Sequence, residues 1–387
     1  MKKVNCQTRI SENIIENLNN KSEETMKKVL TIGGATEDVY LDYEGADCMK
    51  IMQSDGDKNF LLFESDAKIE VDKVLYFTGG GATNSAVSFK RLGFDVSCFC
   101  MTGDDKESKH ILDVLKKEKV NTSNIATSKK YPSGRSFIIN SLKRERTIFA
   151  FRGSNGFLQK KDLPLKSIKE ADQLYITSLS YETSKILKDI TTFAKKNKVP
   201  VAINPGKSQL SKGAKYLKES LKNIDTFILN YSEAKTFMWS LVSSNKCYKE
   251  CMCPEEKEVT AKTTFLRTNF YFSIPNFLKE VLSMGPKIVV VTDGKNGVYV
   301  ATKNQMFFHP SLKIKVVDTV GAGDSFGSCF VACLAKGLKI EDALRYGIVN
   351  SASVIENMGA KPGLLRFNEL EKRTKKLGSK LLQKHRL

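Results

Sequence analysis

The sequence contains no run of about 20 consecutive apolar residues, which is the length that a helix needs to cross a lipid bilayer. Its first 26 residues are polar and lack the apolar core of a signal peptide. Internal repeats and low-complexity tracts are absent as well. We therefore expect a cytoplasmic protein without a membrane partner, in which residues 1–26 form a flexible or weakly helical extension.

Acidic residues are scarce relative to basic ones, since 62 Lys and Arg face 43 Asp and Glu and leave a net charge of +19. An excess of this size suits an anionic partner, and nucleic acid is one option. The lysines, however, are spread over most segments and form no basic stripe with interleaved aromatics. We therefore expect no nucleic-acid partner and a Lys-rich solvated surface whose positive field helps to attract a small anion.

The nine cysteines are expected to remain reduced in such a chain. Four of them lie in apolar runs and are predicted to be small core residues: Cys98, Cys100, Cys329 and Cys333. Three others cluster with C-x3-C-x-C spacing: Cys247, Cys251 and Cys253. A fourth metal ligand is not evident near this cluster, so a surface loop is favoured over a zinc site.

The apolar pattern from residue 174 onward predicts strands that alternate with helices, within a chain long enough for one large domain. Strands are expected at 174–177, 199–204, 226–229 and 288–292, and helices at 182–197, near 214–222 and near 232–241. Such alternation favours a mostly parallel sheet with helices on both faces. Residues 242–276 interrupt the pattern as an insertion that contains the cysteine cluster. Two further helices are predicted between Leu338 and Ile355, and residues 371–387 are interpreted as a basic, solvated, helical tail.

A second group of short strands is predicted at about 39–77 and 135–151, where polar turns separate β-branched and aromatic residues. Helical spacing at 82–93 and 108–119 flanks a strand at 96–101. The two groups of short strands are expected to pair into a small sheet that is separate from the parallel one.

Residues 314–327 carry the clearest chemical signal in the chain. The β-branched run 314–317 predicts a strand, Gly321-Ala322-Gly323 predicts a turn, and the apolar run from residue 326 predicts a helix. Free N–H groups at such a turn, together with the helix dipole, favour a bound anion. Asp324 would oppose that anion unless it takes a proton from a hydroxyl that attacks a bound phosphoryl group. An ordinary glycine-rich turn with a capping acid is the alternative.

The segment Asp-Thr-Val-Gly-Ala-Gly-Asp-Ser-Phe at 318–326 is similar to the C-terminal signature of the ribokinase-like, or PfkB, family of carbohydrate kinases. A second segment, 79–86 followed by Arg91-Leu92-Gly93, resembles the N-terminal glycine motif of that family. The resemblance covers about residues 27–370. It implies a three-layer α/β/α sandwich with a mostly parallel central sheet and a small β-sheet lid over the substrate. It also implies ATP-dependent phosphorylation of a hydroxymethyl group of a sugar or related polyol, with Mg²⁺ as cofactor.

The resemblance supports Asp324 as the base that deprotonates the sugar hydroxyl, with the N–H groups of Gly321, Ala322 and Gly323 as donors to the phosphoryl group. Asn230 and Glu233 match an N-x-x-E motif that helps to organise phosphate and Mg²⁺, the metal being held by Glu233 through water. A helix cap with a first-turn acid is the alternative for this pair.

For the nucleotide, the resemblance assigns Thr292, Gly294 and Gly297 to the ATP site, although a hairpin turn would explain them equally well. An apolar helix face around 348–352 is expected near the adenine. A monovalent cation such as K⁺ is implied at a loop formed by three residues: Asp318, Val320 and Gly359.

For the acceptor sugar, the resemblance implies five residues: Asp38, Gly79, Gly80, Asn84 and Asn155. A carboxylate such as that of Asp38 accepts two hydroxyl groups at once, which suits a vicinal diol. Each of the five could instead be an ordinary turn residue. One departure from the family is Gly81, which stands where ribokinases commonly have Lys and weakens ribose as a specific assignment.

Three alternatives accompany the sugar-kinase interpretation. A nucleoside kinase of the same family would stack a purine on lid aromatics such as Phe137, Phe149 and Phe151. A non-catalytic sugar- or nucleotide-binding regulator could use the same scaffold, although retention of the motif residues argues against it. A basic nucleic-acid-binding protein is the weakest option. Relatives often form homodimers through the lid, but the sequence shows no decisive apolar lid face.

Overall fold

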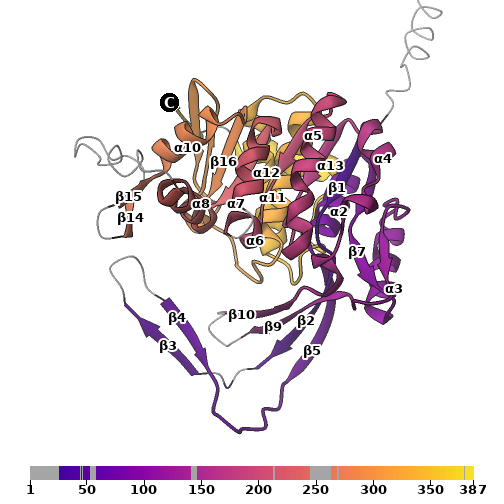
Figure 1. The fold of residues 1–387 in the computed structure, drawn as a ribbon. Helices are drawn as coiled ribbons and strands as arrows, with labels where there is room; N and C mark the ends of the chain where they lie inside the picture. The colour runs from indigo at the N-terminus through magenta and orange to yellow at the C-terminus, as the bar shows by residue number, and fades with distance from the viewer. Residues whose placement is uncertain are drawn as a thin grey trace, which may run out of the picture.

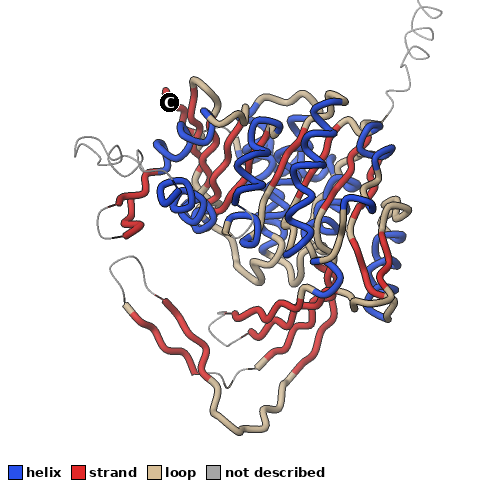
Figure 2. The backbone as a smooth tube through the Cα atoms, in the orientation of Figure 1, coloured by secondary structure: helices blue, strands red, loops and turns tan. Residues whose placement is uncertain are grey.

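A computed structural model describes residues 26–378 and 380–387, apart from residues 44, 46, 53–57, 141–145, 212–213, 245–262 and 268–269. The main body is a large sheet with helices on both faces, and a smaller sheet lies below it in Figure 1. Figure 2 shows the same layers, with the strands of the main sheet between groups of helices. The predicted fold class, a three-layer sandwich with a lid, is confirmed.

The main sheet runs in the order β19-β18-β17-β16-β13-β12-β11-β1-β6 within the described residues. The bounds of its strands are Lys28–Ile32 (β1), Asp95–Phe99 (β6), Gln173–Ile176 (β11), Val201–Ile203 (β12), Thr226–Asn230 (β13), Ile288–Thr292 (β16), Val298–Ala301 (β17), Gln305–His309 (β18) and Gln383–Arg386 (β19). Neighbours from β6 to β16 pair in parallel. The remaining strands continue the sheet in antiparallel fashion. Strands β18 and β19 were not predicted.

Two apolar cores lie on opposite faces of this sheet because successive side chains of a strand point to opposite sides. In β13, Phe227 and Leu229 enter one core, whereas Ile228 enters the other. The first core is covered by α4 (Leu165–Glu170), α5 (Leu187–Lys196), α6 (Lys207–Leu210), α7 (Ala214–Ser220), α8 (Tyr231–Ser244) and α10 (Ile274–Ser283). The second is covered by α2 (Gly81–Arg91), α3 (Lys106–Lys117), α11 (Ala322–Ala335), α12 (Ile340–Ile355) and α13 (Phe367–Leu377). Each fully buried Phe or Leu stabilises the fold by about 1.5–3 kcal/mol.

In the described part of the chain, the lid is a four-stranded sheet in the order β10-β9-β2-β5. Its strands are Thr36–Asp42 (β2), Lys73–Gly79 (β5), Gly134–Asn140 (β9) and Arg146–Phe151 (β10). The predicted strand group at 39–77 divides into two parts, because β3 (Asp47–Ile51) and β4 (Lys58–Leu62) form a two-stranded sheet of their own. This β3–β4 hairpin extends away from the lid (Figure 1).

The strand register divides the lid residues between two faces. Asp38 pairs with Ser136, and Ser136 pairs with Ala150, so these side chains share one face. We call it the inner face, because Tyr40 and Arg146 on the same face contact Asp318, just before the glycine turn. The adjacent register positions form the opposite, outer face, which carries exposed apolar residues: Val74, Tyr76, Phe137, Phe149 and Phe151.

This register corrects two expectations. The aromatic residues suggested as a purine platform (Phe137, Phe149 and Phe151) lie on the outer face, opposite Asp38, and cannot stack a base beside it. The lid also does have an apolar face, which the sequence alone did not reveal. Alternation along single strands was visible, but the alignment between strands far apart in the chain was not.

Several predicted elements differ in the structure. Residues 314–317 form a loop rather than a strand, and Val316 and Val317 are about 40% exposed (41% and 38%) instead of buried in the sheet. The segment 338–355 contains one helix, α12, where two were predicted. The tail is not a solvated helix throughout, because α13 ends at Leu377 and β19 then pairs with β18.

The predicted insertion at 242–276 contains regular structure at its ends. Helix α8 continues to Ser244, and a hairpin of β14 (Thr263–Arg267) and β15 (Phe270–Ser273) leads into α10. Cys247, Cys251 and Cys253 lie outside the described residues, as does the extension up to residue 25. Buried positions are confirmed for the four predicted core cysteines: Cys98, Cys100, Cys329 and Cys333.

Candidate active site

The glycine turn at the start of α11 has a backbone that only glycine supports. Gly321 adopts a φ of 80°, and a Cβ atom there would lie 2.5 Å from the Cβ atom of Ala360. A Cβ atom on Gly323, by contrast, would meet no atom within 4 Å. Within the described residues, the N–H group of Ala322 makes a long bond of 3.3 Å to Thr319 O. The turn therefore presents main-chain N–H groups beside open space at the positive end of a helix.

Asp324 lies in the first turn of α11 and is held by a chain of buried polar groups. The Nδ2 atom of Asn84 donates to Asp324 Oδ2 at 2.8 Å, and the Nζ atom of Lys361 donates to Asn84 Oδ1 at 2.7 Å. Lys361 also donates to Thr78 O at 2.6 Å and to Thr83 Oγ1 at 3.1 Å. Because an ammonium group only donates, it fixes the orientation of the Asn84 amide, and that amide in turn holds the carboxylate.

Burial shifts the pKa values of these groups in a consistent way. Burial raises the pKa of Asp324, and the hydrogen bond from Asn84 and the charge of Lys361 oppose that rise. The carboxylate is surrounded by protein atoms on most sides but keeps part of its surface open to solvent. Burial also lowers the pKa of Lys361 to about 8, against the attraction of Asp38 and Asp324. The two acids and the lysine thus form one electrostatic unit.

Asp38 extends this unit from the inner face of the lid. Its side chain is 5% exposed and accepts a hydrogen bond of 2.9 Å from Thr36 Oγ1. Burial raises its pKa, while bonds from Ser136 and Thr36 lower it. A Cβ atom on Gly79 would lie 1.9 Å from Asp38 Oδ2, so the carboxylate occupies space that only a glycine leaves free.

The glycines at the start of α2 explain the departure from the family pattern. Gly80 has a φ of 90°, and a Cβ atom there would lie 2.5 Å from Gly34 O. At Gly81, a Cβ atom would lie 2.5 Å from Thr177 Oγ1. A lysine at position 81 would therefore displace Thr177. The buried cation that bonds to Asn84 in this chain is Lys361, which follows the loop at Gly359.

Asn155 is buried below the lid and is bonded at both ends of its amide. Its Oδ1 atom accepts from Ala35 N at 2.8 Å, and its Nδ2 atom donates to Ala35 O at 2.7 Å. The side chain thereby anchors the chain just before β2, which carries Asp38. A direct contact of Asn155 with a sugar stays a prediction.

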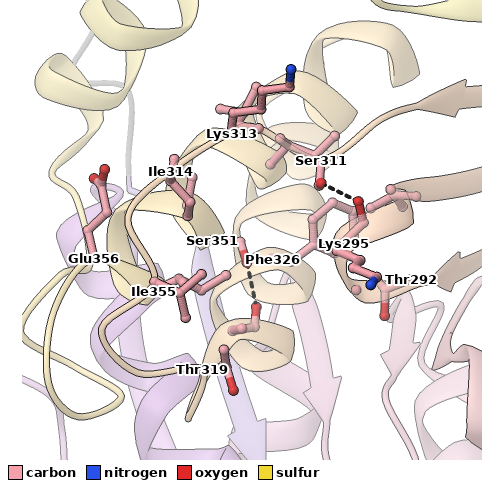
Figure 3. A pocket seen from close by; sticks show the side chains of 18 of the residues that line it. Thr292, Lys295, Ser311, Lys313, Ile314, Thr319, Phe326, Ser351, Ile355 and Glu356 are labelled. Carbon is pink, nitrogen blue, oxygen red and sulfur yellow. Dashed lines mark hydrogen bonds between the residues drawn. The ribbon is translucent and has the colours of Figure 1, made fainter. Parts of the chain in front are cut away.

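A cavity of about 920 Å³ opens beside the glycine turn. Its walls include Ala322 and Gly323 from α11 and the loop 311–316. Figure 3 shows Thr292 and Lys295 on one side of the pocket and Ile314 and Glu356 on the other. Most of the run predicted as a strand, from Ile314 to Val316, thus forms part of the cavity wall.

The residues predicted for the nucleotide meet at this cavity. Thr292, Gly294 and Gly297 line it from the turn between β16 and β17, and Ile348 and Ala352 line it from α12. The turn is also a tight hairpin, in which Asp293 N donates to Gly297 O at 2.8 Å. A hairpin turn and a place in the cavity wall are therefore compatible for this segment. Apolar and polar side chains line the cavity in nearly equal numbers, which suits a flat heterocycle that carries polar groups.

Asn230 and Glu233 form a reciprocal helix cap at the start of α8. Asn230 N donates to Glu233 Oε2 at 2.9 Å, and Glu233 N donates to Asn230 Oδ1 at 2.8 Å. Asn230 pairs with Thr292 across β13 and β16, so the cap lies at the same sheet edge as the cavity. Burial raises the pKa of Glu233 to about 7, and the charge of Asp324 adds to the rise.

Three residues of this region were missed by sequence reasoning. Lys361 follows the loop that holds Gly359, and Tyr40 and Arg146 reach Asp318 from the lid. A lysine in a glycine- and proline-containing loop carries no signal of burial, and neither lid residue belongs to a motif. Only the tertiary structure brings them to the site.

Two features are absent from the residues that the structure describes. No group of three or more His, Cys, Asp or Glu side chains is placed to hold a metal ion in that part of the chain. Across the same residues, every helix is too short or too polar to cross a membrane.

The main sheet, the lid, and the acid at the glycine turn beside the cavity form an arrangement that could position and stabilise a phosphoryl group during its transfer to an alcohol. A family model described as pfkB family carbohydrate kinase matches residues 26–365. The chain belongs to this family, and it is an ATP-dependent carbohydrate kinase in the broad sense that includes sugar and nucleoside kinases.

Individual relatives and solved structures resemble the chain at low sequence identity. A ribokinase of Staphylococcus aureus is 26% identical over 297 residues, which cover 76% of this chain and 87% of that protein. A nucleoside kinase of Methanocaldococcus jannaschii, described as an archaeal member of the ribokinase family, superposes with a TM-score of 0.68 at 19% identity, covering 91% of this chain and 99% of that one. A putative ribokinase II of E. coli in complex with ATP and Mg²⁺ gives a TM-score of 0.70 at 18% identity, covering 91% and 100%. These structures establish the fold.

Proposed function

We propose that the protein uses ATP to phosphorylate a hydroxymethyl group of a sugar or a related small polyol, with Asp324 as the general base. The observation that carries this proposal is the bond from Asn84 to Asp324, which holds the carboxylate beside the glycine turn and near Asp38. The acceptor would bind between Asp38 and Asp324, with Gly79, Gly80 and Asn84 around it. The nucleotide would occupy the cavity lined by the β16–β17 turn and α12.

In the proposed reaction, Asp324 accepts the proton of the acceptor hydroxyl as its oxygen bonds to the γ-phosphorus of ATP. The bond between that phosphorus and the bridging oxygen breaks, and ADP leaves with the electron pair. The N–H groups of Gly321, Ala322 and Gly323 donate to the phosphoryl oxygens, where charge is stabilised by a preorganised site. The raised pKa of Asp324 suits this role, because a stronger base takes the proton more readily.

Mg²⁺ would neutralise charge on the β- and γ-phosphates when bound. Glu233 is the residue proposed to hold it, through water. The helix cap engages Oε2 of this carboxylate, and the second oxygen is available to a hydrated ion. The raised pKa of Glu233 fits the same role, since a cation nearby would relieve the penalty on its charged form.

A nucleoside acceptor is the second candidate. Its support is the likeness to the archaeal nucleoside kinase and the absence of a lysine at position 81. The outer-face phenylalanines do not contribute to it. A substrate screen with ribose, fructose, 2-keto-3-deoxygluconate, adenosine and other nucleosides, followed by ADP release, separates the two acceptor classes.

The Asp324→Asn variant tests the mechanism. Asn keeps the bond from Asn84 but cannot accept a proton, so we expect normal folding and a loss of about 10²–10⁴-fold in kcat. Near-normal turnover would remove Asp324 as the base. Binding of ATP and sugar by the wild-type protein without acceptor-dependent ADP release would instead favour a non-catalytic regulator.

A further inference from the structure

Asp318 lies just before the glycine turn and accepts four hydrogen bonds from residues that the structure describes. Its Oδ1 atom accepts from Arg146 Nη1 at 3.1 Å and from Val320 N at 2.9 Å. Its Oδ2 atom accepts from Tyr40 Oη at 2.6 Å and from Gly359 N at 3.0 Å. The Asp318 side chain is 4% exposed, so these donors replace nearly all of its contact with water.

These contacts do not fit a monovalent cation at Asp318. A carboxylate has about four acceptor positions, and the four donors fill them. Val320 and Gly359, which the family resemblance also assigned to the cation, approach Asp318 with their N–H groups. The positive charge next to the carboxylate comes from Arg146, whose guanidinium is always protonated.

The donors to Asp318 come from two parts of the molecule. Tyr40 and Arg146 belong to β2 and β10, on the inner face of the lid. Val320 directly precedes Gly321 of the glycine turn, and Gly359 directly precedes Ala360, against which Gly321 packs. Asp318 is therefore a junction between the sheet that carries Asp38 and the turn that carries the proposed phosphoryl donors.

We propose that Arg146 is a lid-borne positioning residue that takes the place of a monovalent cation at Asp318 and couples the lid to the glycine turn. With Arg146 in place, Asp318 stays fixed, and it holds the N–H groups of Val320, which precedes the turn, and of Gly359, which precedes the alanine that packs against it. The part of this proposal that concerns catalysis rests on the proposed function, whereas the part that concerns the turn does not.

A purely structural ion pair is the competing explanation, and it predicts a different kinetic pattern. An ion pair that only attaches the lid to the main body would affect thermal stability. It would also affect the KM of the acceptor, since Asp38 is on the lid. A positioning role at the glycine turn would lower kcat, because small misplacements of phosphoryl donors are costly in rate. It would also make the variant sensitive to small cations that can enter the vacated space.

The experiment compares Arg146→Ala with Arg146→Lys and with the control Lys73→Ala, which removes an exposed lid cation at the start of β5. Each protein is assayed with saturating ATP in K⁺, guanidinium and tetramethylammonium salts of equal ionic strength. We expect wild-type and Lys73→Ala turnover to be the same in K⁺ and tetramethylammonium. For Arg146→Ala we expect kcat to fall about 10- to 100-fold in tetramethylammonium, with partial recovery in K⁺ or guanidinium, and a smaller loss for Arg146→Lys.

Amide hydrogen exchange without ligands provides a readout that is independent of activity. Loss of Arg146 should speed exchange of the Val320 and Gly359 amides about tenfold, as expected when a charge-assisted network loses one member. Lys73→Ala should leave both rates unchanged.

The proposal is overturned by any of three results: K⁺-dependent turnover of the wild-type protein, a change of acceptor KM alone in Arg146→Ala, or unchanged exchange at both amides. If no acceptor is phosphorylated by the wild-type protein, the proposed function fails, and the exchange data still decide whether Arg146 holds the turn.

Discussion

At the scale of single residues, the site is built from buried charged groups. Each of them would destabilise the fold if it were buried alone, and its neighbours offset much of that desolvation penalty. Lys361 is only 6% exposed. Burial of its ammonium group without partners would cost several kcal/mol of desolvation free energy. Three oxygen acceptors and two nearby carboxylates offset that penalty in part, which is why its pKa falls only to about 8. The same arrangement orients Asn84, and so the position of the proposed base depends on a lysine that belongs to neither glycine motif.

Lys361 predicts a pH dependence of activity. Above pH 8 the amine loses its proton, and its hold on Asn84 Oδ1 weakens, so we expect kcat to decline on the alkaline side with a pKa near 8. Replacement by Met, which keeps the length but not the charge, should lower kcat about 10- to 100-fold and abolish this alkaline limb. The measurement is a kcat–pH profile from pH 6 to 9.5. A Met variant that retains the limb would assign it to another group.

The stability of the Lys361→Met variant serves as the control. The pKa of Lys361 in the folded state lies below its unfolded value of 10.5. Its contribution to the free energy of unfolding is therefore most favourable above pH 10.5 and is lost as the pH falls through 8. At pH 7 the charged lysine therefore costs about 3 kcal/mol. Loss of its hydrogen bonds costs a similar amount in the variant, so we expect little change in Tm at pH 7.

At the scale of elements, the sequence predicted the pieces of the site better than their surroundings. The helix after Gly321 and the strand–helix junction at Asn230 were correct because glycine conformation, helix capping and short-range periodicity are local properties. The strand at 314–317 was wrong because β-branched residues also suit an apolar cavity wall. The contacts of Arg146, Tyr40 and Lys361 could not be predicted, since they join segments that are 172 to 283 residues apart.

The cap at the start of α8 gives a prediction about stability. Burial raises the pKa of Glu233 from 4.5 to about 7, so the folded state binds this proton more tightly than the unfolded state. Its favourable contribution is present below pH 4.5 and is lost as the pH rises through 7. The full shift corresponds to at most about 3 kcal/mol, and partial exposure reduces it. Glu233→Gln keeps an acceptor for Asn230 N without the charge.

We therefore expect Glu233→Gln to be more stable than the wild-type protein at pH 8 by about 1–2 kcal/mol, and to differ little from it at pH 4.5. Urea unfolding at both pH values measures the difference. The matched control is Glu369→Gln, an exposed first-turn acid of α13 in an ion pair with Arg373, for which a change below about 1 kcal/mol is expected. A stability difference for Glu233→Gln that does not vary with pH would contradict the raised pKa.

At the scale of the whole molecule, the lid divides its two faces between two tasks. The inner face carries Asp38, Tyr40 and Arg146 toward the main body. The outer face exposes aromatic side chains, with 61% of Tyr76, 56% of Phe149 and 51% of Phe151 accessible. Large aromatic residues gathered on one face are typical of surfaces that bind another protein, since they bury much area at low entropic cost.

We predict that a second copy of this chain covers the outer face and that the protein is a homodimer through its lid. A charge at the centre of such an interface leaves an unpaired ion in an apolar setting, so Phe149→Glu should convert the dimer to a monomer. Sedimentation velocity over a range of concentrations measures the change. Leu165→Glu, at an exposed apolar position of α4 (47% accessible), is the matched control and should leave the assembly intact. A wild-type protein that stays monomeric at high concentration, or a Phe149→Glu variant that remains dimeric, would show that the outer face has a different partner.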